Sequence, residues 1–279
     1  MVQSRFVRHS LIMFVCLFVI AAGVFVQAAV AAEFEPRVGQ EGKDVIWVPT
    51  PQALVERMLD MAKLTPQDFV IDLGSGDGRT VITAAKRGAR AMGIEYEPNM
   101  VELSKRNAAK EGVSDKTQFI KADLFETDFS QATVITMFLL EEINLRLRPR
   151  LLDMKPGTRV VSNAFTMGEW TADETVTVEG SKDCGFYCTA LLWIVPAKVE
   201  GTWKLPQGEL TITQTFQTFS GTLKTGSRNI AVLDGKLTGD QIRFSVGDAM
   251  YSGRVSGSTM QGTVTSGGST TPWSAARAK

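Results

Sequence analysis

The pattern of apolar and polar positions along the chain changes near Pro196. Before this residue, short apolar runs of strand length alternate with segments whose apolar residues recur at helical spacing. After it, apolar and polar residues alternate with a period of two, between turn signals such as Asp234-Gly235. We therefore expect two domains, an α/β domain over residues 43–196 and a small all-β domain over residues 200–279.

The α/β pattern predicts the following elements. Strands are expected over residues 69–71, 91–94, 117–120, 132–138, 158–161, 175–178 and 187–195, and helices over residues 51–62, 79–87, 98–111 and 141–152. Pro149 is expected to break the last helix, because proline suits the start of a second short helix better than a helix interior. Strands alternating with helices form a parallel sheet with helices on both faces. Since only a loop separates the last two strands, the final strand is expected to run antiparallel.

The all-β pattern predicts about seven or eight short antiparallel strands. Strands of this length and spacing form a small barrel or sandwich. Four aromatic side chains are expected to fill its core: Trp203, Phe216, Phe219 and Trp273.

Residues 1–32 have the features of a secretory signal peptide. Arg5 and Arg8 precede an apolar run over residues 11–26, and small residues follow up to a cleavage position after Ala32. An uncleaved membrane anchor is the alternative, because the apolar run approaches a spanning length. In either case the positive flank stays inside. The rest of the chain is therefore expected in the periplasm or cell envelope, close to the membrane if residues 11–26 remain attached.

Charge and histidine content narrow the chemistry. The whole chain has 30 basic and 30 acidic residues, and residues 33–279 carry 28 − 30 = −2 because Arg5 and Arg8 lie in the signal segment. The single histidine, His9, also lies there. Without it, a Ser-His-Asp or Cys-His nucleophile and a histidine-ligated metal are excluded, and we expect no metal site. A near-neutral body also argues against a nucleic-acid partner, which is bound by neutralising phosphates.

Two cysteines, Cys184 and Cys188, remain after the signal segment. An oxidising compartment permits a disulfide between them, but an extended strand would hold their α-carbons too far apart. A bridge therefore needs a turn, which Gly185 can supply. Two reduced cysteines in a strand hairpin are the alternative.

The stretch Asp72-Leu73-Gly74-Ser75-Gly76-Asp77-Gly78 lies between a predicted strand and a predicted helix. Glycines at such a turn let a ligand approach the backbone. A dinucleotide needs Gly-x-Gly-x-x-Gly, whereas here the third glycine comes one residue early and Asp77 lies inside the turn. A carboxylate about 4 Å from a pyrophosphate oxygen costs on the order of 4 kcal/mol at an effective dielectric constant near 20. A cationic cofactor without phosphate, such as S-adenosylmethionine, avoids this repulsion.

The motif resembles that of the class I S-adenosylmethionine-dependent methyltransferases. This resemblance implies a Rossmann-like sheet of seven mostly parallel strands, with Glu95 accepting the ribose hydroxyls and Asp123 and Leu124 beside the adenine. Thr50 would close over the methionine end of the cofactor, and a helix N-cap is its alternative role. The implied cofactor site consists of Thr50, Asp72, Gly74, Ser75, Gly76, Asp77, Gly78, Glu95, Asp123 and Leu124.

Further segments are similar to a bacterial branch of the enzymes that methylate lysine on the ATP synthase c-subunit and the adenine nucleotide translocase. They are Val48-Pro49-Thr50-Pro51, Ala122-Asp123-Leu124-Phe125, Arg159-Val160-Val161-Ser162-Asn163-Ala164-Phe165 and Gly168-Glu169-Trp170. The resemblance covers about residues 45–195 and makes a protein lysine the leading acceptor. A lysine amine must be neutral to accept a methyl group, and Glu141 or Glu142 is expected to orient it. Asn144, Asn163 and Phe165 are expected near the mouth of the site, without an assigned role.

Two other functions stay open at this stage. One is methylation of a small molecule or a lipid. The other is a non-catalytic envelope module, because S-adenosylmethionine is made in the cytoplasm and export separates the chain from that source. A basic run of Arg146, Arg148, Arg150 and Lys155 is either a solvated helix face or a docking surface for an acidic partner.

Overall fold

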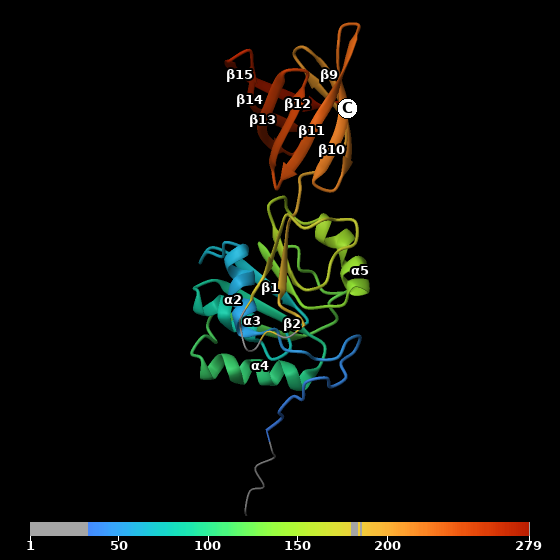
Figure 1. Ribbon diagram of the computed structural model, residues 1–279. Coiled ribbons are helices and arrows are strands. Elements are labelled where there is room, and N and C mark those ends of the chain that lie inside the picture. Colours follow the sequence, from blue (N-terminus) through green and yellow to red (C-terminus); the bar gives the residue numbers. More distant parts are fainter. Residues whose placement is uncertain (1–32, 180–183, 185, 279) are drawn as a thin grey trace, which may run out of the picture. The chain divides into compact units, whose positions relative to one another are not determined.

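The computed structural model describes residues 33–179, 184 and 186–278. The predicted signal segment, residues 1–32, lies outside the described residues. Among the helices that are described, none is long and apolar enough to cross a membrane. The strands form two separate sheets that share no strand, one with helices packed against it and one closed into a barrel (Figure 1).

The first sheet has seven strands in the order β3-β2-β1-β4-β5-β7-β6. Their bounds are β1 (Phe69–Leu73), β2 (Arg90–Glu95), β3 (Thr117–Lys121), β4 (Val134–Met137), β5 (Arg159–Asn163), β6 (Glu174–Thr177) and β7 (Thr189–Ile194). The first five strands are parallel, and β7 pairs antiparallel with both β5 and β6. This confirms the expected mostly parallel sheet and the antiparallel last strand.

Helices cover both faces of this sheet, as predicted. Side chains of α2 (Gln52–Met61), α3 (Arg79–Lys86) and α4 (Pro98–Lys110) share one apolar core with the strands, and α5 (Glu141–Leu152) shares the other. Adjacent residues of one strand therefore both bury apolar side chains, which is why the central strands have continuous apolar runs.

The break expected at Pro149 is wrong, because α5 continues through this proline. Leu147 and Leu151 lie on either side of it, and neither has any exposed surface. Both pack into the same core. Burial of the helix face thus compensates for the backbone hydrogen bond that proline cannot donate.

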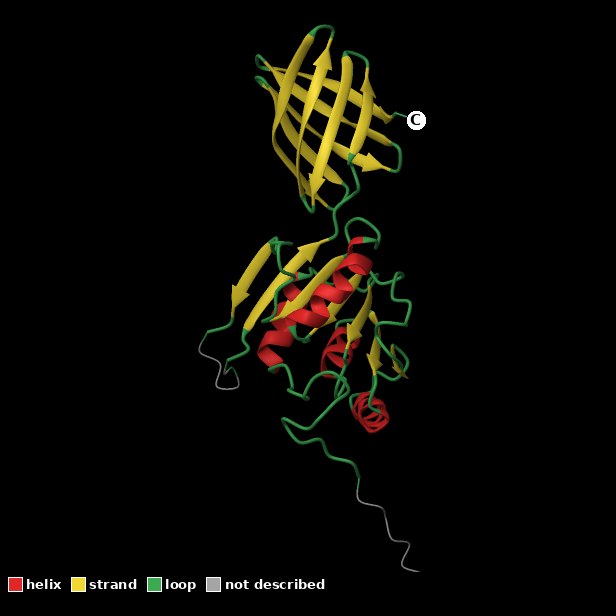
Figure 2. Ribbon diagram, turned by 90° about the vertical axis from the view of Figure 1, so that its right-hand side faces the viewer, coloured by secondary structure: helices red, strands yellow, loops and turns green. Residues whose placement is uncertain are grey.

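The second sheet is a closed antiparallel barrel of eight strands (Figure 2). Its strands are β8 (Gly201–Leu205), β9 (Gly208–Thr215), β10 (Thr218–Thr225), β11 (Arg228–Thr238), β12 (Gln241–Val246), β13 (Ala249–Ser256), β14 (Thr259–Ser266) and β15 (Ser269–Arg277). The barrel closes where β15 meets β8, through the residue pairs Ala276–Lys204 and Arg277–Trp203.

Three of the four predicted aromatic core residues, Trp203, Phe219 and Trp273, lie in the barrel core. Phe216 is a correction, because it occupies the turn between β9 and β10 with a φ of 53° and packs outside this core. Alternation along a strand predicts which side chains point inward, but it does not extend through a tight turn.

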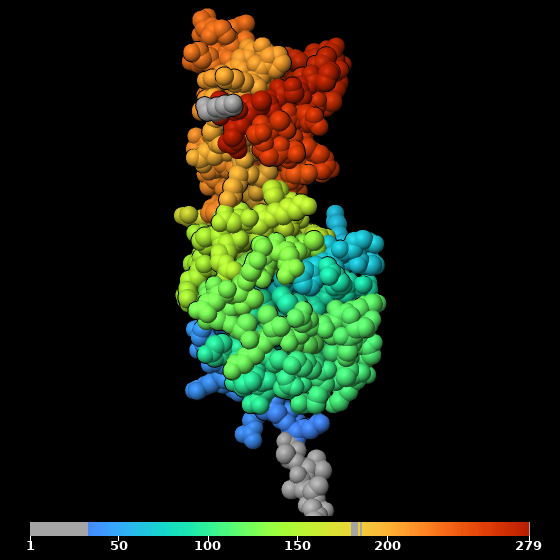
Figure 3. Space-filling model, turned by 180° about the vertical axis from the view of Figure 1, so that it is seen from behind, coloured from blue at the N-terminus to red at the C-terminus, as the bar shows by residue number. Residues whose placement is uncertain are grey.

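The chain before α2 forms an irregular segment, residues 35–50, that is blue in Figure 3 and lies on the surface. A backbone bridge joins Glu41 to Ile46. Trp47 also donates its amide to the carbonyl of Gln40 and accepts from the amide of Gly39, at 2.9 Å each. These bonds fold the segment back on itself and fix the backbone of Trp47.

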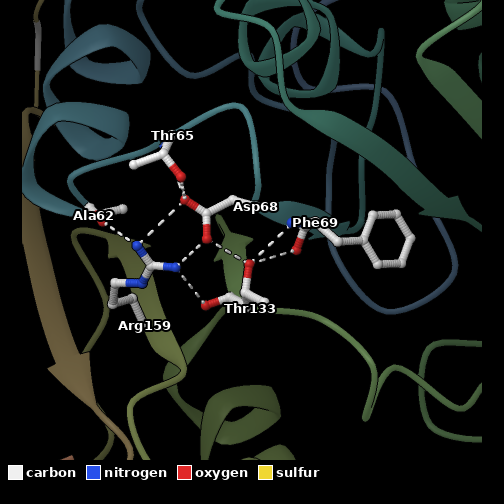
Figure 4. Close-up of polar contacts among 6 residues, drawn as sticks. All are labelled: Ala62, Thr65, Asp68, Phe69, Thr133 and Arg159. Carbon is white, nitrogen blue, oxygen red and sulfur yellow. Dashed lines mark hydrogen bonds and ion pairs between the residues drawn. The ribbon is translucent and has the colours of Figure 1, made fainter.

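The amino ends of the strands are joined by a buried polar network (Figure 4). Asp68, at the start of β1, forms an ion pair with Arg159 of β5 and accepts hydrogen bonds from the hydroxyls of Thr133 (2.7 Å) and Thr65 (2.9 Å). Arg159 also donates to the carbonyl of Ala62 at 2.9 Å, just after α2. The network therefore ties α2, β1 and β5 together at the edge remote from the glycine-rich loop.

Three residues of the basic run lie on α5, where Arg146 is exposed and Arg148 and Arg150 are partly buried, and docking of an acidic partner stays a prediction. Arg148 donates to the carbonyl of Met167 at 2.9 Å, and Arg150 donates to the carbonyls of Leu124 and Phe125 at 3.1 and 2.6 Å. The guanidinium of Arg146 lies 3.7 Å from the centre of the Phe125 ring. These arginines hold loops of their own chain.

The cysteine question is also settled by the structure, in which Cys184 and Cys188 form a disulfide with their α-carbons 5.5 Å apart. Cys188 comes immediately before β7, so the bridge lies in the connection that leads into this strand rather than within extended strand.

Candidate functional site

A cavity lies at the carboxyl ends of β1, β2 and β4, where the loops that follow these strands converge. Nine of the ten residues predicted to hold the cofactor line it: Thr50, Asp72, Gly74, Ser75, Gly76, Asp77, Glu95, Asp123 and Leu124. The exception is Gly78. Because the carboxyl ends of neighbouring parallel strands meet at one edge, residues distant in sequence are brought together here.

The glycine-rich loop turns sharply between β1 and α3. Gly74, Gly76 and Gly78 all have positive φ, at 76°, 54° and 82°, which side chains disfavour. Gly78 serves packing instead of the cavity, because a Cβ on it would lie 2.8 Å from atoms of both Phe119 and Ser104. The loop therefore depends on glycine for its conformation at three positions and for close packing at Gly78.

Asp72 is buried at the end of β1 and accepts a hydrogen bond of 2.6 Å from the hydroxyl of Thr136. Burial raises the pKa of this carboxyl group to about 7; the bond from Thr136 opposes that shift, and the nearby charges of Glu95 and Asp77 add to it. A buried carboxylate in this state is stabilised by a cationic ligand.

Glu95 is held at the end of β2 by three backbone amides. One carboxylate oxygen accepts from Gly76 at 2.8 Å, and the other accepts from Tyr96 at 2.9 Å and Glu97 at 3.0 Å. Burial raises the pKa of Glu95, and the three amides act against it. The carboxylate is thus fixed in place, and the oxygen that accepts only from Gly76 keeps acceptor capacity for a ligand hydroxyl.

Asp123 lies after β3 and is engaged by a neighbour that the sequence did not identify. Lys43 forms an ion pair with it and also lies 4.7 Å from the centre of the Tyr96 ring. The hydrogen bond from Lys43 is the main reason that the pKa of Asp123 is lowered. Leu124 follows on the cavity wall, so an acceptor and an apolar surface stand side by side, as predicted for an adenine subsite.

Asp77 differs from its predicted role as a free negative charge. Arg79 pairs with it through two nitrogens, at 2.6 and 3.0 Å, and donates to the carbonyl of Thr50 at 2.9 Å. The pair offsets much of the charge of Asp77. The repulsion expected between this loop and a phosphate therefore depends mainly on Asp72 and Glu95.

Thr50 is not a helix N-cap. Pro51 occupies the N-cap position of α2, where no side-chain capping bond is made. Thr50 is buried and lines the cavity next to Pro49. Its placement agrees with its other predicted role, as a residue beside the methionine end of the cofactor.

Besides Lys43, two further residues of the site were missed by sequence reasoning. A Cβ on Gly76 would lie 2.7 Å from the indole nitrogen of Trp47, so the segment before α2 packs directly on the glycine-rich loop. Gly93 makes room for Ser75, whose hydroxyl would lie 2.4 Å from a Cβ at that position. A tryptophan in the short apolar run Val45-Ile46-Trp47-Val48 was the available signal for the first, and Gly93 within a strand was the signal for the second.

The two acids proposed to orient the acceptor begin α5 and are exposed. Glu141 accepts a hydrogen bond of 2.5 Å from the hydroxyl of Thr166, and neither Glu141 nor Glu142 lines the cavity. Their role therefore stays a prediction.

The residues of the cavity fit S-adenosylmethionine. This cofactor carries an ammonium, a sulfonium, a ribose and an adenine, but no phosphate. Burial raises the pKa values of Asp72 and Glu95, so a cation in the cavity relieves an unfavourable concentration of negative charge. The buried hydroxyl of Ser75, which has no hydrogen-bond partner within the described part of the chain, offers a further polar contact.

The comparisons with known proteins match the same region. Residues 72–174 match the model of the ANTKMT methyltransferase domain family. A "Protein-lysine N-methyltransferase" of Saccharolobus islandicus is 45% identical over 138 residues, which are 48% of this chain and 86% of that protein. A human lysine N-methyltransferase, named for the ATP synthase c-subunit, is 35% identical over 135 residues, which are 48% of this chain and 57% of that protein.

A solved structure is similar as well. It is described as an RNA methyltransferase from Salinibacter ruber in complex with S-adenosyl-L-homocysteine. It is 45% identical, with a TM-score of 0.51, and the match covers 55% of this chain and 96% of that one. The chain thus spans nearly all of two short relatives and little more than half of the human one.

Proposed function

The chain belongs to the class I S-adenosylmethionine-dependent methyltransferases, in the family of the ANTKMT methyltransferase domain, and from this premise we propose that its acceptor is a lysine amine of a protein. The observation that carries the proposal is the 45% identity to a protein named as a protein-lysine N-methyltransferase, over 86% of that protein. The human relative, 35% identical, is likewise named for a lysine on a protein.

The residues of the cavity divide the work of holding the cofactor. Asp72 would receive the ammonium group, Glu95 the ribose hydroxyls, and Asp123 with Leu124 the adenine. When bound, S-adenosylmethionine supplies a methyl group that forms an N–C bond as its S–C bond breaks, with the electron pair left on sulfur. The protein's task is to align the amine and to exclude water, which requires neither histidine nor a metal.

An RNA acceptor is the second candidate, because the similar Salinibacter ruber protein is described as an RNA methyltransferase. Charge argues against it. Residues 33–279 carry a formal charge of −2, whereas RNA binding relies on neutralising phosphates with Lys and Arg. A small-molecule or lipid acceptor is the third candidate. The comparisons favour an enzyme over the non-catalytic envelope module.

We also propose that the chain is exported by residues 1–32 and works at the cell envelope. The positive flank, the apolar run and the small residues before Glu33 support this location. A disulfide in the folded chain agrees with an oxidising compartment. N-terminal sequencing of protein recovered from its native compartment tests it. A chain that starts at Glu33 supports cleavage, and a full-length chain in the cytoplasmic fraction contradicts the proposal.

Transfer of labelled methyl groups distinguishes the acceptors. The full chain is incubated with methyl-labelled S-adenosylmethionine and separated protein, RNA and lipid fractions of the envelope and cytoplasm. Label in one protein band, found as methyl-lysine after digestion, is the expected result. Label that is lost on ribonuclease treatment would establish RNA instead, and label in the lipid fraction would establish a lipid. Asp72→Ala is the control and should abolish labelling in every fraction.

A further inference from the structure

We propose that Phe138, Phe165 and Tyr187, here called the aromatic cluster, form with Asn163 the subsite that binds the acceptor lysine side chain. The inference rests on the proposed function and names the part of the surface that selects the acceptor. The three rings are mutually in contact, with centroid distances of 5.3 Å for Phe138–Tyr187, 5.9 Å for Phe165–Tyr187 and 6.1 Å for Phe138–Phe165.

The aromatic cluster lies at the same edge of the sheet as the cofactor cavity. Phe138 follows β4 and Phe165 follows β5, while Tyr187 precedes β7, which runs antiparallel to β5. Since β4, β5 and β7 are neighbours, all three rings come together at the carboxyl edge of the parallel strands. Phe138 also lines the cofactor cavity, so the aromatic cluster begins where that cavity ends.

The aromatic cluster is open to solvent, and the loop that carries Phe165 is held in place. Tyr187 is 40% exposed, and Phe138 and Phe165 are half-buried, so the rings are not closed into the core. The loop carrying Phe165 is fixed from two sides, because its carbonyl accepts from the amide of Asn144 at 3.2 Å and from the hydroxyl of Ser162 at 2.9 Å. Solvent-facing rings that contact one another, one of them on an anchored loop, are suited to receive an apolar chain.

Asn163, the last residue of β5, supplies the second observation. It has no exposed surface, yet neither the oxygen nor the nitrogen of its amide has a hydrogen-bond partner among the described residues. Leaving such a group unpaired is unfavourable, and native structures usually give it a partner or a role. Pairing of Thr136 with both Asp72 and Val161 places Asn163, two residues beyond Val161, on the sheet face of Asp72.

This combination fits a lysine better than a charged or purely apolar acceptor. Aromatic faces pack against the methylene stem of lysine and also attract the methylated ammonium product. The amide oxygen of Asn163 can accept a hydrogen bond from the amine while carrying no charge. A carboxylate in its place would favour the ammonium form, which has no lone pair to accept a methyl group. The subsite therefore orients the amine without raising its pKa.

Binding of a minimal acceptor tests the subsite without knowledge of the natural one. The probe is Nα-acetyl-lysine N-methylamide, titrated by NMR into the full chain saturated with S-adenosylhomocysteine. We expect saturable binding that weakens about tenfold in Tyr187→Ala and in Asn163→Ala. Tyr187→Phe keeps the ring and should bind like the wild type.

Phe186→Ala is the matched control, because Phe186 is 98% exposed and adjacent to Tyr187 in the chain. It should bind the probe normally. All four variants should keep their affinity for S-adenosylhomocysteine, which shows that they are folded. The proposal would be overturned if the wild type did not bind the probe, or if Tyr187→Ala and Asn163→Ala bound it as tightly as the wild type does.

Steady-state kinetics separates this proposal from the proposed function. The substrate is the acceptor protein that the labelling experiment identifies. Asn163→Asp should shift the pH–rate profile to higher pH, because a carboxylate raises the pKa of the bound amine. Methyl-lysine formation with unchanged KM in Tyr187→Ala and an unchanged profile in Asn163→Asp would reject the subsite and leave the proposed function intact. Label on RNA or lipid in place of lysine would reject both.

Discussion

Asp68 and Asp72 lie at opposite ends of β1, and each is more than nine-tenths buried. Burial alone would raise the pKa of Asp68, but Arg159, Thr133 and Thr65 outweigh it and hold the pKa below its ordinary value. Asp72 instead shares its surroundings with Glu95, and burial raises its pKa to about 7. A buried carboxylate that brings its own cation stabilises the fold, whereas one without a cation is available to a charged ligand. The same strand thus has a structural end, at Asp68, and a ligand-binding end, at Asp72.

The largest effect on stability is expected from removing the Asp68–Arg159 ion pair at the structural end of β1. We expect Asp68→Ala to lower the free energy of unfolding by about 3 kcal/mol, because it leaves Arg159 with no counter-charge in a largely buried position. Urea denaturation measures this change. Asp60→Ala is the control, since Asp60 is paired with Arg87 but exposed, and it should cost under about 1 kcal/mol. A loss as small as the control's in Asp68→Ala would contradict the comparison.

A substitution at the ligand-binding end of β1 should have the opposite effect, weakening ligand binding without loss of stability. We expect Asp72→Asn to weaken S-adenosylhomocysteine binding about 30-fold, because a charge-assisted contact to the ammonium is lost. The free energy of unfolding should stay equal or rise, since a buried charge is removed. Titration calorimetry and urea denaturation measure the two quantities, with Asp60→Asn as the control. Unchanged affinity in both Asp72→Asn and Glu95→Gln would remove the assignment of the cofactor site.

The two aspartates also predict opposite pH dependences. Asp72 has a raised pKa, so the folded chain without cofactor holds its proton more tightly than the unfolded chain does. Its contribution to stability is therefore lost as pH rises from about 4 to about 7. Asp68 has a lowered pKa, so its contribution is present above about pH 4 and is lost as pH falls through the folded-state value.

Cofactor binding should follow Asp72. As pH rises toward 7, affinity for S-adenosylhomocysteine should increase by up to about tenfold per pH unit, and above pH 7 it should level off. The reason is that the ammonium group needs the ionised carboxylate of Asp72. Asp72→Asn should remove this slope. A wild-type affinity that is flat over roughly pH 5.5 to 7, below the folded-state pKa, would show that Asp72 is already ionised in the free chain.

A smaller effect is expected at the adenine end of the cavity. Lys43 is paired with Asp123, the predicted partner of the adenine amino group, and we expect cofactor binding to compete with this pair. Because this pair is exposed, we expect Lys43→Ala to tighten S-adenosylhomocysteine binding only about two- to threefold at low salt. High salt should reduce the difference from the wild type by screening the pair. Weaker binding in Lys43→Ala would show that Lys43 assists the cofactor.

Sequence reasoning predicted the elements and the cavity where local and topological rules coincide. The motif from Asp72 to Gly78 sits between a buried strand and a helix, and the parallel order of β1 to β4 then brings Glu95 and Asp123 to the same edge. The antiparallel last strand followed from the missing helix before it. These features depend on spacing and strand order, which are readable in the sequence.

Features set by tertiary packing were not readable. Pro149 remains inside α5 because Leu147 and Leu151 are buried on both sides of it. The charge of Asp77 is offset by Arg79, two residues away, and a sequence gives no geometry for that pair. Asn163 could be placed near the mouth from its position after a strand, but only the folded chain shows that its amide is buried without a partner among the described residues.

The narrow junction of β15 with β8 has a practical consequence for handling the protein. Only the last residues of the final strand, at Ala276 and Arg277, complete the cylinder, whereas β14 and β15 pair along their whole length. Removal of a few residues from this end of β15 would break its pairing with β8 and open the barrel. The unpaired backbone groups of β8 would then be available to pair with strands of other molecules. Expression designs should therefore preserve these residues and attach any purification tag through a flexible spacer beyond Lys279.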